Sequence, residues 1–84
     1  VTNPQPASRA FSMLPKTIHE HDIKYVQSQL AKIPYSCRVR ACDGYSRAWT
    51  DAYEADPELR HKENKARHTA NTRLREYVDR VLAR

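Results

Sequence analysis

The sequence predicts an all-α domain of three helices, with a disordered or extended N-terminal arm before it and a long helix at its C-terminal end. Three observations predict this fold class. Apolar residues recur at intervals of three and four between residues 17 and 82, as they do on one face of a helix. No segment shows the alternation of apolar and polar residues, or the turn signals, of a β-hairpin. Pro34 and Pro57 divide the periodic region into three segments.

Residues 1–16 are expected to form the arm. Three prolines stand there among small and polar residues, a composition that favours an extended or disordered chain. Phe11, Met13 and Leu14 form a short apolar group that would allow the arm to dock. Residues 17–84 then make a single helical domain.

A first helix is predicted over about residues 17–33. Thr17-Ile18-His19-Glu20 has the form of a capping box, in which the threonine hydroxyl and the glutamate carboxylate accept hydrogen bonds from each other's backbone N–H groups. The apolar seam of this helix comprises Ile23, Val26, Leu30 and Ile33. Pro34 ends it.

A second helix is predicted over residues 35–55 as the central core helix, because apolar residues cover close to half of its circumference. The main stripe comprises Tyr35, Val39, Cys42, Trp49 and Tyr53, and beside it stand Ala41, Tyr45, Ala48 and Ala52. Gly44, the single glycine of the chain, falls on the opposite, polar face. A glycine in a helix interior costs roughly 1 kcal/mol relative to alanine, which a bend or the close approach of a partner would explain.

Two residues of the second helix have two interpretations each. Arg38 is the one charge inside the apolar arc, so its guanidinium either reaches water past its own stem or pairs with a carboxylate across an interface. Trp49 has a tyrosine four residues away on either side. Packing in the core is the favoured interpretation of this trio, and a platform for stacked bases of a single strand is the other.

A third helix is predicted over about residues 57–82. Asp56-Pro57-Glu58 combines an N-cap residue, a proline at the first helical position and an acid in the first turn. The inner stripe comprises Leu59, Ala66, Ala70, Leu74, Tyr77, Val78 and Val81. Ala66 and Ala70 are expected to let another helix come close. An interruption, if there is one, is expected between Thr69 and Thr72, where threonine and asparagine side chains compete for backbone hydrogen bonds.

Basic residues are concentrated in this third helix. The formal net charge is +5, and residues 57–84 hold eight lysines and arginines against four acids, a balance of +4. This charge favours a polyanionic partner, although the bases spread around the helix and three of them stand four residues after an acid, at the spacing of ion pairs. The candidate contacts for nucleic acid are Lys65, Arg67, Arg73 and Arg75. The candidate contacts for a protein partner are Arg38, Trp49, Ala66 and Ala70.

The residue pattern predicts no enzyme activity, metal or cofactor. His19 and His21 are two residues apart and would point to different sides of a helix, whereas helical zinc ligands are four residues apart. His61 and His68 share a face, but Lys65 lies between them and disfavours a metal cation. No histidine stands with a nucleophile and an orienting acid at a telling spacing.

The length of the chain and its two cysteines bear on its oligomeric state and its cellular location. A chain of 84 residues buries only about 60–65% of its unfolded surface, so the core is thin, and a homodimer is expected because self-association buries more. Cys37 and Cys42 would lie about 140° apart on a helix and are expected to be reduced thiols. The N-terminus has no signal peptide, and no run approaches 18 apolar residues. A cytoplasmic protein without a membrane contact is therefore expected.

Two short stretches carry a resemblance. Ile33-Pro34, followed by an aromatic and arginine-bearing helix and by Ala70-Asn71-Thr72-Arg73-Leu74-Arg75-Glu76, is similar to small prophage-encoded proteins and to a helical stretch near the N-terminus of the phage replication gene A family. The resemblance implies a phage context and a role in a replication complex. The His-hydrophobic-His site and paired tyrosines of that family's nicking domain have no match here, so the resemblance implies no nuclease.

The leading hypothesis is a phage-type accessory protein that contacts nucleic acid or a replication complex through the basic C-terminal helix. The alternative is a protein-binding inhibitor or adaptor of a host machine, with no nucleic-acid contact. In that case the aromatic helix or the N-terminal arm would make the contact.

Overall fold

The computed structural model describes residues 13–55 and 59–84 of the chain, and the predicted all-α, three-helix fold is confirmed there. A short 3-10 turn, η1 (Glu20–Asp22), leads into α2 (Ile23–Leu30), which is followed by α3 (Tyr35–Ala55) and α4 (Leu59–Ala83). The predicted arm lies largely outside the described residues, and so does the turn predicted at Asp56-Pro57-Glu58. No helix among the described residues is both long enough and apolar enough to cross a membrane.

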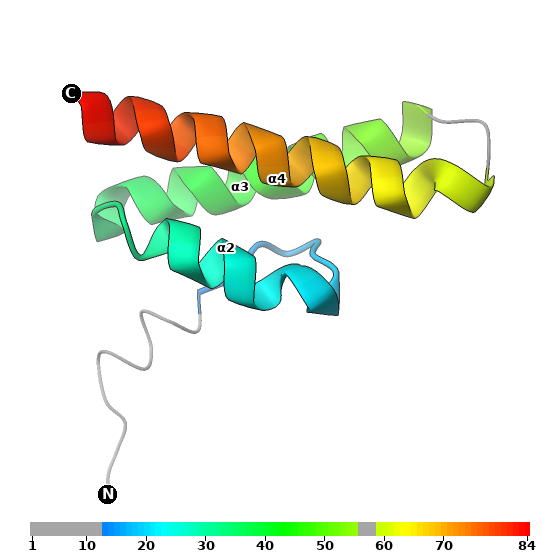
Figure 1. The fold of residues 1–84 in the computed structure, drawn as a ribbon, viewed down its shortest axis with the longest axis horizontal. Helices are drawn as coiled ribbons and strands as arrows, with labels where there is room; N and C mark the ends of the chain where they lie inside the picture. The colour runs from blue at the N-terminus through cyan, green and yellow to red at the C-terminus, as the bar shows by residue number, and fades with distance from the viewer. Residues whose placement is uncertain (1–12, 56–58) are drawn as a thin grey trace, which may run out of the picture.

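The two long helices form an antiparallel pair, and the shorter α2 lies along one flank of that pair, chiefly against α4 (Figure 1). The core between them is made of small and medium side chains from all three helices. Its buried members are Val26, Leu30, Ile33, Ala41, Cys42, Tyr45, Ala48, Ala70, Leu74 and Val78. Most of the apolar seam predicted for the first helix, and Ala70, Leu74 and Val78 of the seam predicted for the third, therefore belong to the core.

The first helix begins at residue 20, three residues later than the capping-box pattern predicts. His19 is the N-cap, and its ring Nδ1 accepts a hydrogen bond from the His21 backbone N–H at 3.0 Å. The Thr17 N–H is bound elsewhere, because it donates to the Ser46 hydroxyl of α3 at 3.1 Å. A tertiary hydrogen bond thus replaces the local capping arrangement and fixes the chain entering the helix against α3.

Arg38 ties the end of α2 to the start of α3. Its guanidinium Nε donates to the backbone carbonyls of Leu30, at 2.8 Å, and Ile33, at 3.1 Å. Carbonyls at the end of a helix lack intrahelical partners, and a guanidinium satisfies them with charge-assisted bonds. The sequence predicts water or a carboxylate as the partner of this guanidinium. The structure shows that it binds backbone carbonyls at the end of α2 instead.

The apolar stripe predicted for the second helix is rotated in the structure. Tyr35 and Val39, predicted on the main stripe, have 59% and 48% of their surface exposed, whereas Ala41, Tyr45 and Ala48, predicted beside it, are buried. The alanines face α4 because they let the two backbones approach closely. The larger side chains of the predicted stripe are displaced to the flank or the end of the helix.

α4 is one continuous helix through residues 69–72, the place where the sequence favours an interruption if there is one. Asn71 carries the side chain that most readily competes for backbone hydrogen bonds. Its amide oxygen instead accepts a hydrogen bond of 2.6 Å from the Tyr45 hydroxyl. With that group engaged across the interface, the helix backbone keeps its own hydrogen bonds.

Both cysteines are free thiols, as predicted. Cys42 is buried in the core, and burial raises the pKa of its thiol above the ordinary value. A buried, protonated thiol packs as a small apolar side chain and is a poor nucleophile.

Candidate functional site

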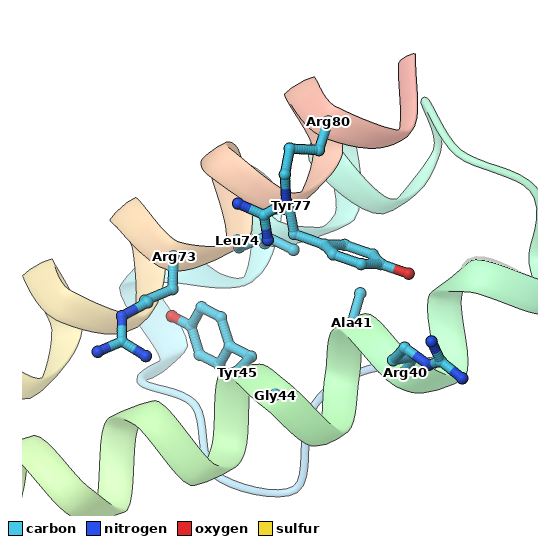
Figure 2. Close-up of a pocket in the computed structure, with 8 residues that line it drawn as sticks. All are labelled: Arg40, Ala41, Gly44, Tyr45, Arg73, Leu74, Tyr77 and Arg80. Carbon is cyan, nitrogen blue, oxygen red and sulfur yellow. The ribbon is translucent and has the colours of Figure 1, made fainter. Parts of the chain in front are cut away.

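A hollow lies between α3 and α4. Its volume is about 250 Å³, and it is lined by Arg40, Ala41, Gly44, Tyr45, Arg73, Leu74, Tyr77 and Arg80 (Figure 2). We call this hollow the α3/α4 groove. Its floor is apolar, because Ala41 and Leu74 belong to the buried core and the Tyr77 ring packs against that core.

Three arginines surround the α3/α4 groove, and they come from both helices. Arg40 belongs to α3, whereas Arg73 and Arg80 stand two turns apart on the same side of α4. All three are exposed, and no carboxylate is among the described residues that line the hollow. The combination of an apolar floor and a cationic rim suits a ligand with an apolar body and negative charges.

Tyr77 and Arg80 are arranged together at this rim. The Arg80 guanidinium carbon lies 6.0 Å from the centroid of the Tyr77 ring, within the range of a cation–π contact. Figure 2 shows the Tyr77 ring extending from α4 toward Ala41 of α3. The guanidinium therefore lies over the ring, and the two side chains together form this part of the rim.

Gly44 leaves the middle of the groove open. It is an exposed residue inside α3, it has no positive φ angle, and a Cβ atom built on it would meet no other atom within 4 Å. Neither the backbone conformation nor a neighbouring side chain of the described residues therefore requires glycine. The bend considered for this position finds no support in the continuous helix, and the close approach of a partner stays as the other interpretation.

Replacing Gly44 by alanine is expected to stabilise the fold by about 0.5–1 kcal/mol, because alanine loses less backbone entropy in a helix and meets no clash here. Thermal unfolding followed by circular dichroism should show a melting temperature higher by about 3–6 °C for a chain of this size. A lower melting temperature would mean that the backbone at this position needs the freedom of glycine.

Next to the groove, a partly buried polar network joins α3, α4 and η1. Tyr45 of α3 is 1% exposed and donates its hydroxyl hydrogen to Asn71. Arg67 of α4 binds the Asp22 carboxylate with two bonds, from Nε at 2.8 Å and from Nη2 at 3.1 Å. Burial, reinforced by the nearby negative charge of Asp22, raises the pKa of the Tyr45 hydroxyl far above its ordinary value. The phenol stays protonated and acts only as a hydrogen-bond donor.

The Asp22 carboxylate is held in its charged form. It is only 7% exposed, and the hydrogen bonds from Arg67 lower the pKa of this carboxyl below its ordinary value of 3.8 against the opposing effect of burial. The charge of Arg67 and a hydrogen bond from Asn71 lower it further. The pair therefore fastens η1 to α4 at neutral pH.

Acid is expected to weaken this link. Because the pKa of Asp22 is lower in the folded chain than in the unfolded one, the unfolded chain binds more protons as the pH falls. The stabilising contribution is fully present above about pH 5 and is lost as the pH falls through 3.8 toward the folded pKa. Melting temperatures measured from pH 7 to pH 3 should fall less steeply in Asp22→Asn than in the wild type. Parallel curves for the two proteins would contradict this assignment.

The four cations predicted to contact nucleic acid do not converge. Arg67 is engaged by Asp22, which takes it out of the set available to phosphate, and Lys65 has an interaction within the chain. Arg73 and Arg75 are both exposed, but they are two residues apart and so lie about 160° apart around the helix. Only Arg73 lines the groove.

Arg40 and Arg80 were missed as candidates. Arg80 is one of the three bases that stand four residues after an acid, here Glu76, and its guanidinium lies over the Tyr77 ring. The signal available in the sequence was spacing, because Arg80 stands seven residues after Arg73 and Arg40 stands four residues before Gly44. Such spacing shows which residues share one face of a helix. It does not show that this face of α3 lies next to this face of α4.

All four residues predicted for a partner interface are used inside the chain, since Arg38 binds the carbonyls at the end of α2. Ala66 and Ala70 are completely buried within the chain, and Ala70 belongs to the hydrophobic core. Trp49 is partly buried, and its ring stacks on Tyr53 with centroids 5.3 Å apart. Its indole nitrogen is buried and has no hydrogen-bond partner among the described residues. These positions fit core packing, which was the favoured interpretation of the tryptophan.

The histidine pair at the first turn lies closer than a helical spacing suggests. Because His19 precedes the turn in extended conformation, its ring centroid is only 4.6 Å from that of His21. His19 Nε2 lies 3.8 Å from the Glu63 carboxylate of α4. No group of three or more metal-binding side chains is present in the described part of the chain.

Comparison of the chain with protein-family models, with curated proteins and with solved structures finds no match. The phage context, the homodimer and the cytoplasmic location therefore stay predictions. In this chain the segment that carries the resemblance has a structural use, because Ala70 and Leu74 are buried and Asn71 binds Tyr45.

Proposed function

We propose that this protein binds nucleic acid through the α3/α4 groove. The observation that carries the proposal is that Arg40, Arg73 and Arg80, from two helices, all line one hollow that no described carboxylate lines. The formal charge of +5 acts in the same direction, because it raises the local concentration of a polyanion and the rate of encounter. The basic C-terminal helix contributes, but with two of the seven lysines and arginines of α4 and in combination with α3.

Salt dependence tests the proposal. A protein that neutralises phosphates releases counterions, so affinity falls linearly on a logarithmic scale as salt rises. Fluorescence anisotropy with a mixed-sequence oligonucleotide should show binding at low ionic strength that weakens between about 50 and 200 mM salt. Absence of binding at low salt, or affinity that is insensitive to salt, would reject the proposal.

Arg73→Gln and Arg75→Gln form a matched pair for this experiment. Both remove one exposed arginine from α4, but only Arg73 lines the groove. Arg73→Gln should reduce the slope of the salt dependence by about 0.7–0.9, the contribution of one phosphate contact, and Arg75→Gln should leave it nearly unchanged. Equal effects of the two variants would place the contact elsewhere.

A further inference from the structure

We propose that the nucleic acid bound in the α3/α4 groove is single-stranded, with one unpaired base in the hollow over Gly44 and its flanking phosphates on Arg40, Arg73 and Arg80. The inference rests on the proposed function and specifies the form of the ligand. It follows from the shape of the hollow, from the placement of the cations and from the position of the glycine.

The floor of the groove is apolar, and an apolar surface does not match the charged sugar-phosphate backbone that a duplex presents. Ala41 and Leu74 are buried core residues at its base, and Tyr77 adds an aromatic ring. The bases of a duplex are stacked inside it, so its accessible backbone presents sugars and phosphates to such a surface. An unpaired base has a flat face that can enter a hollow and stack against an aromatic ring.

The cations surround a hollow and do not form a ridge. A helix that reads duplex DNA enters the major groove and presents its contacts along one exposed face. Here the exposed arginines at positions 73 and 75 lie on nearly opposite sides of α4, while Arg40 lines the groove from the neighbouring helix. A backbone that bends around a base can reach cations on both helices, whereas a rigid duplex cannot enter between them.

Gly44 makes the hollow accessible. It stands one turn after Arg40 on α3, and the space next to it is free of other atoms. A side chain here would occupy the hollow, and the fold itself does not need glycine at this position. The absence of a side chain therefore permits the close approach of a flat ligand to the helix backbone.

Tyr77 and Arg80 supply the stacking surface. The guanidinium carbon of Arg80 is 6.0 Å from the centroid of the ring, and both residues line the groove. Aromatic rings and guanidinium planes are the two surfaces on which single-stranded bases stack without sequence preference. We therefore expect little dependence on base identity.

The test fills the hollow without changing any charge. Gly44→Leu places an aliphatic side chain in the open space and keeps all the arginines, and Gly44→Gln fills the same space with a polar side chain. Three labelled probes are compared by anisotropy: an oligothymidylate of about 12 nucleotides, a blunt duplex of the same length, and inorganic polyphosphate. Arg75→Gln serves as the control for loss of charge away from the groove, and circular dichroism melts verify that each variant is folded.

The wild type is expected to bind the single strand about tenfold more tightly than the duplex. Both Gly44 variants should weaken single-strand binding about tenfold and leave binding to polyphosphate within about twofold of the wild type. Arg75→Gln should change single-strand binding by less than about twofold.

The possible failures are distinguishable. If no nucleic acid binds at low salt, the proposed function and this inference both fall. If single strand and duplex bind equally well and the Gly44 variants bind like the wild type, the inference alone is overturned. If a glutamate-rich helical peptide binds the wild type, loses binding in Gly44→Leu and displaces the oligonucleotide, the groove serves a protein partner and the inference is likewise overturned.

Discussion

Asp22→Asn is expected to lower the free energy of unfolding by about 2–3 kcal/mol, a large part of the stability of so small a domain. The substitution keeps the size of the side chain but removes the negative charge that Arg67 contacts with two bonds. The Asp22 and Arg67 side chains are 10% and 27% exposed, so Arg67 would keep a partly desolvated charge without a partner. Urea unfolding followed by circular dichroism measures the change directly.

A double-mutant cycle with Arg67→Gln separates the pair from its surroundings. Each single change leaves one charged partner uncompensated, so the double variant should lose less than the sum of the two single changes. Asp51→Asn is the matched control, because Asp51 is an exposed acid on α3, and it should change stability by less than about 0.5 kcal/mol. If Asp22→Asn costs no more than this control, the bond does not hold η1 to α4.

The ion pair also bears on function through the position of α4. It fixes that helix against the segment that precedes α2, while Arg73 lines the groove. The same helix therefore uses some of its cations to fold and others to face solvent. Their number in the sequence does not tell these two uses apart.

Helical periodicity was enough to predict the seams of the first and third helices. Val26 and Leu30, and Leu74 and Val78, are spaced as residues on one helix face must be, and all four are buried. The second helix was harder because apolar residues cover nearly half of its circumference. Within so wide an arc, periodicity does not decide which line of residues faces α4.

The hydrogen bonds around Asp22 could not be predicted from the spacing of residues within one helix. Pairing rules along a helix compare residues three and four apart, and by these rules the expected partner of Arg67 is Glu63, four residues before it. Its actual carboxylate partner is 45 positions away in the chain. Such a contact depends on how the segments dock, and no spacing within one helix contains that information.

The groove was unpredictable for the same reason. Arg40 and Gly44 share a face of α3, and Arg73, Tyr77 and Arg80 share a face of α4. The sequence contains both faces but not the register that brings them together. Alanines set this register, because they decide which sides of the helices come into closest contact.

Ala70→Leu is therefore expected to be strongly destabilising, by about 3 kcal/mol. Ala70 is completely buried where α4 packs on α3, so three additional carbon atoms can be accommodated only if the helices move apart or neighbouring side chains leave their preferred rotamers. Leucine has nearly the helix propensity of alanine, so the loss would report packing and not helix formation. The same substitution at Ala83, an exposed position at the end of α4, should change stability by less than about 0.5 kcal/mol. Urea unfolding of the two variants makes the comparison, and an Ala70→Leu protein as stable as Ala83→Leu would show that α3 and α4 are not in close contact at this residue.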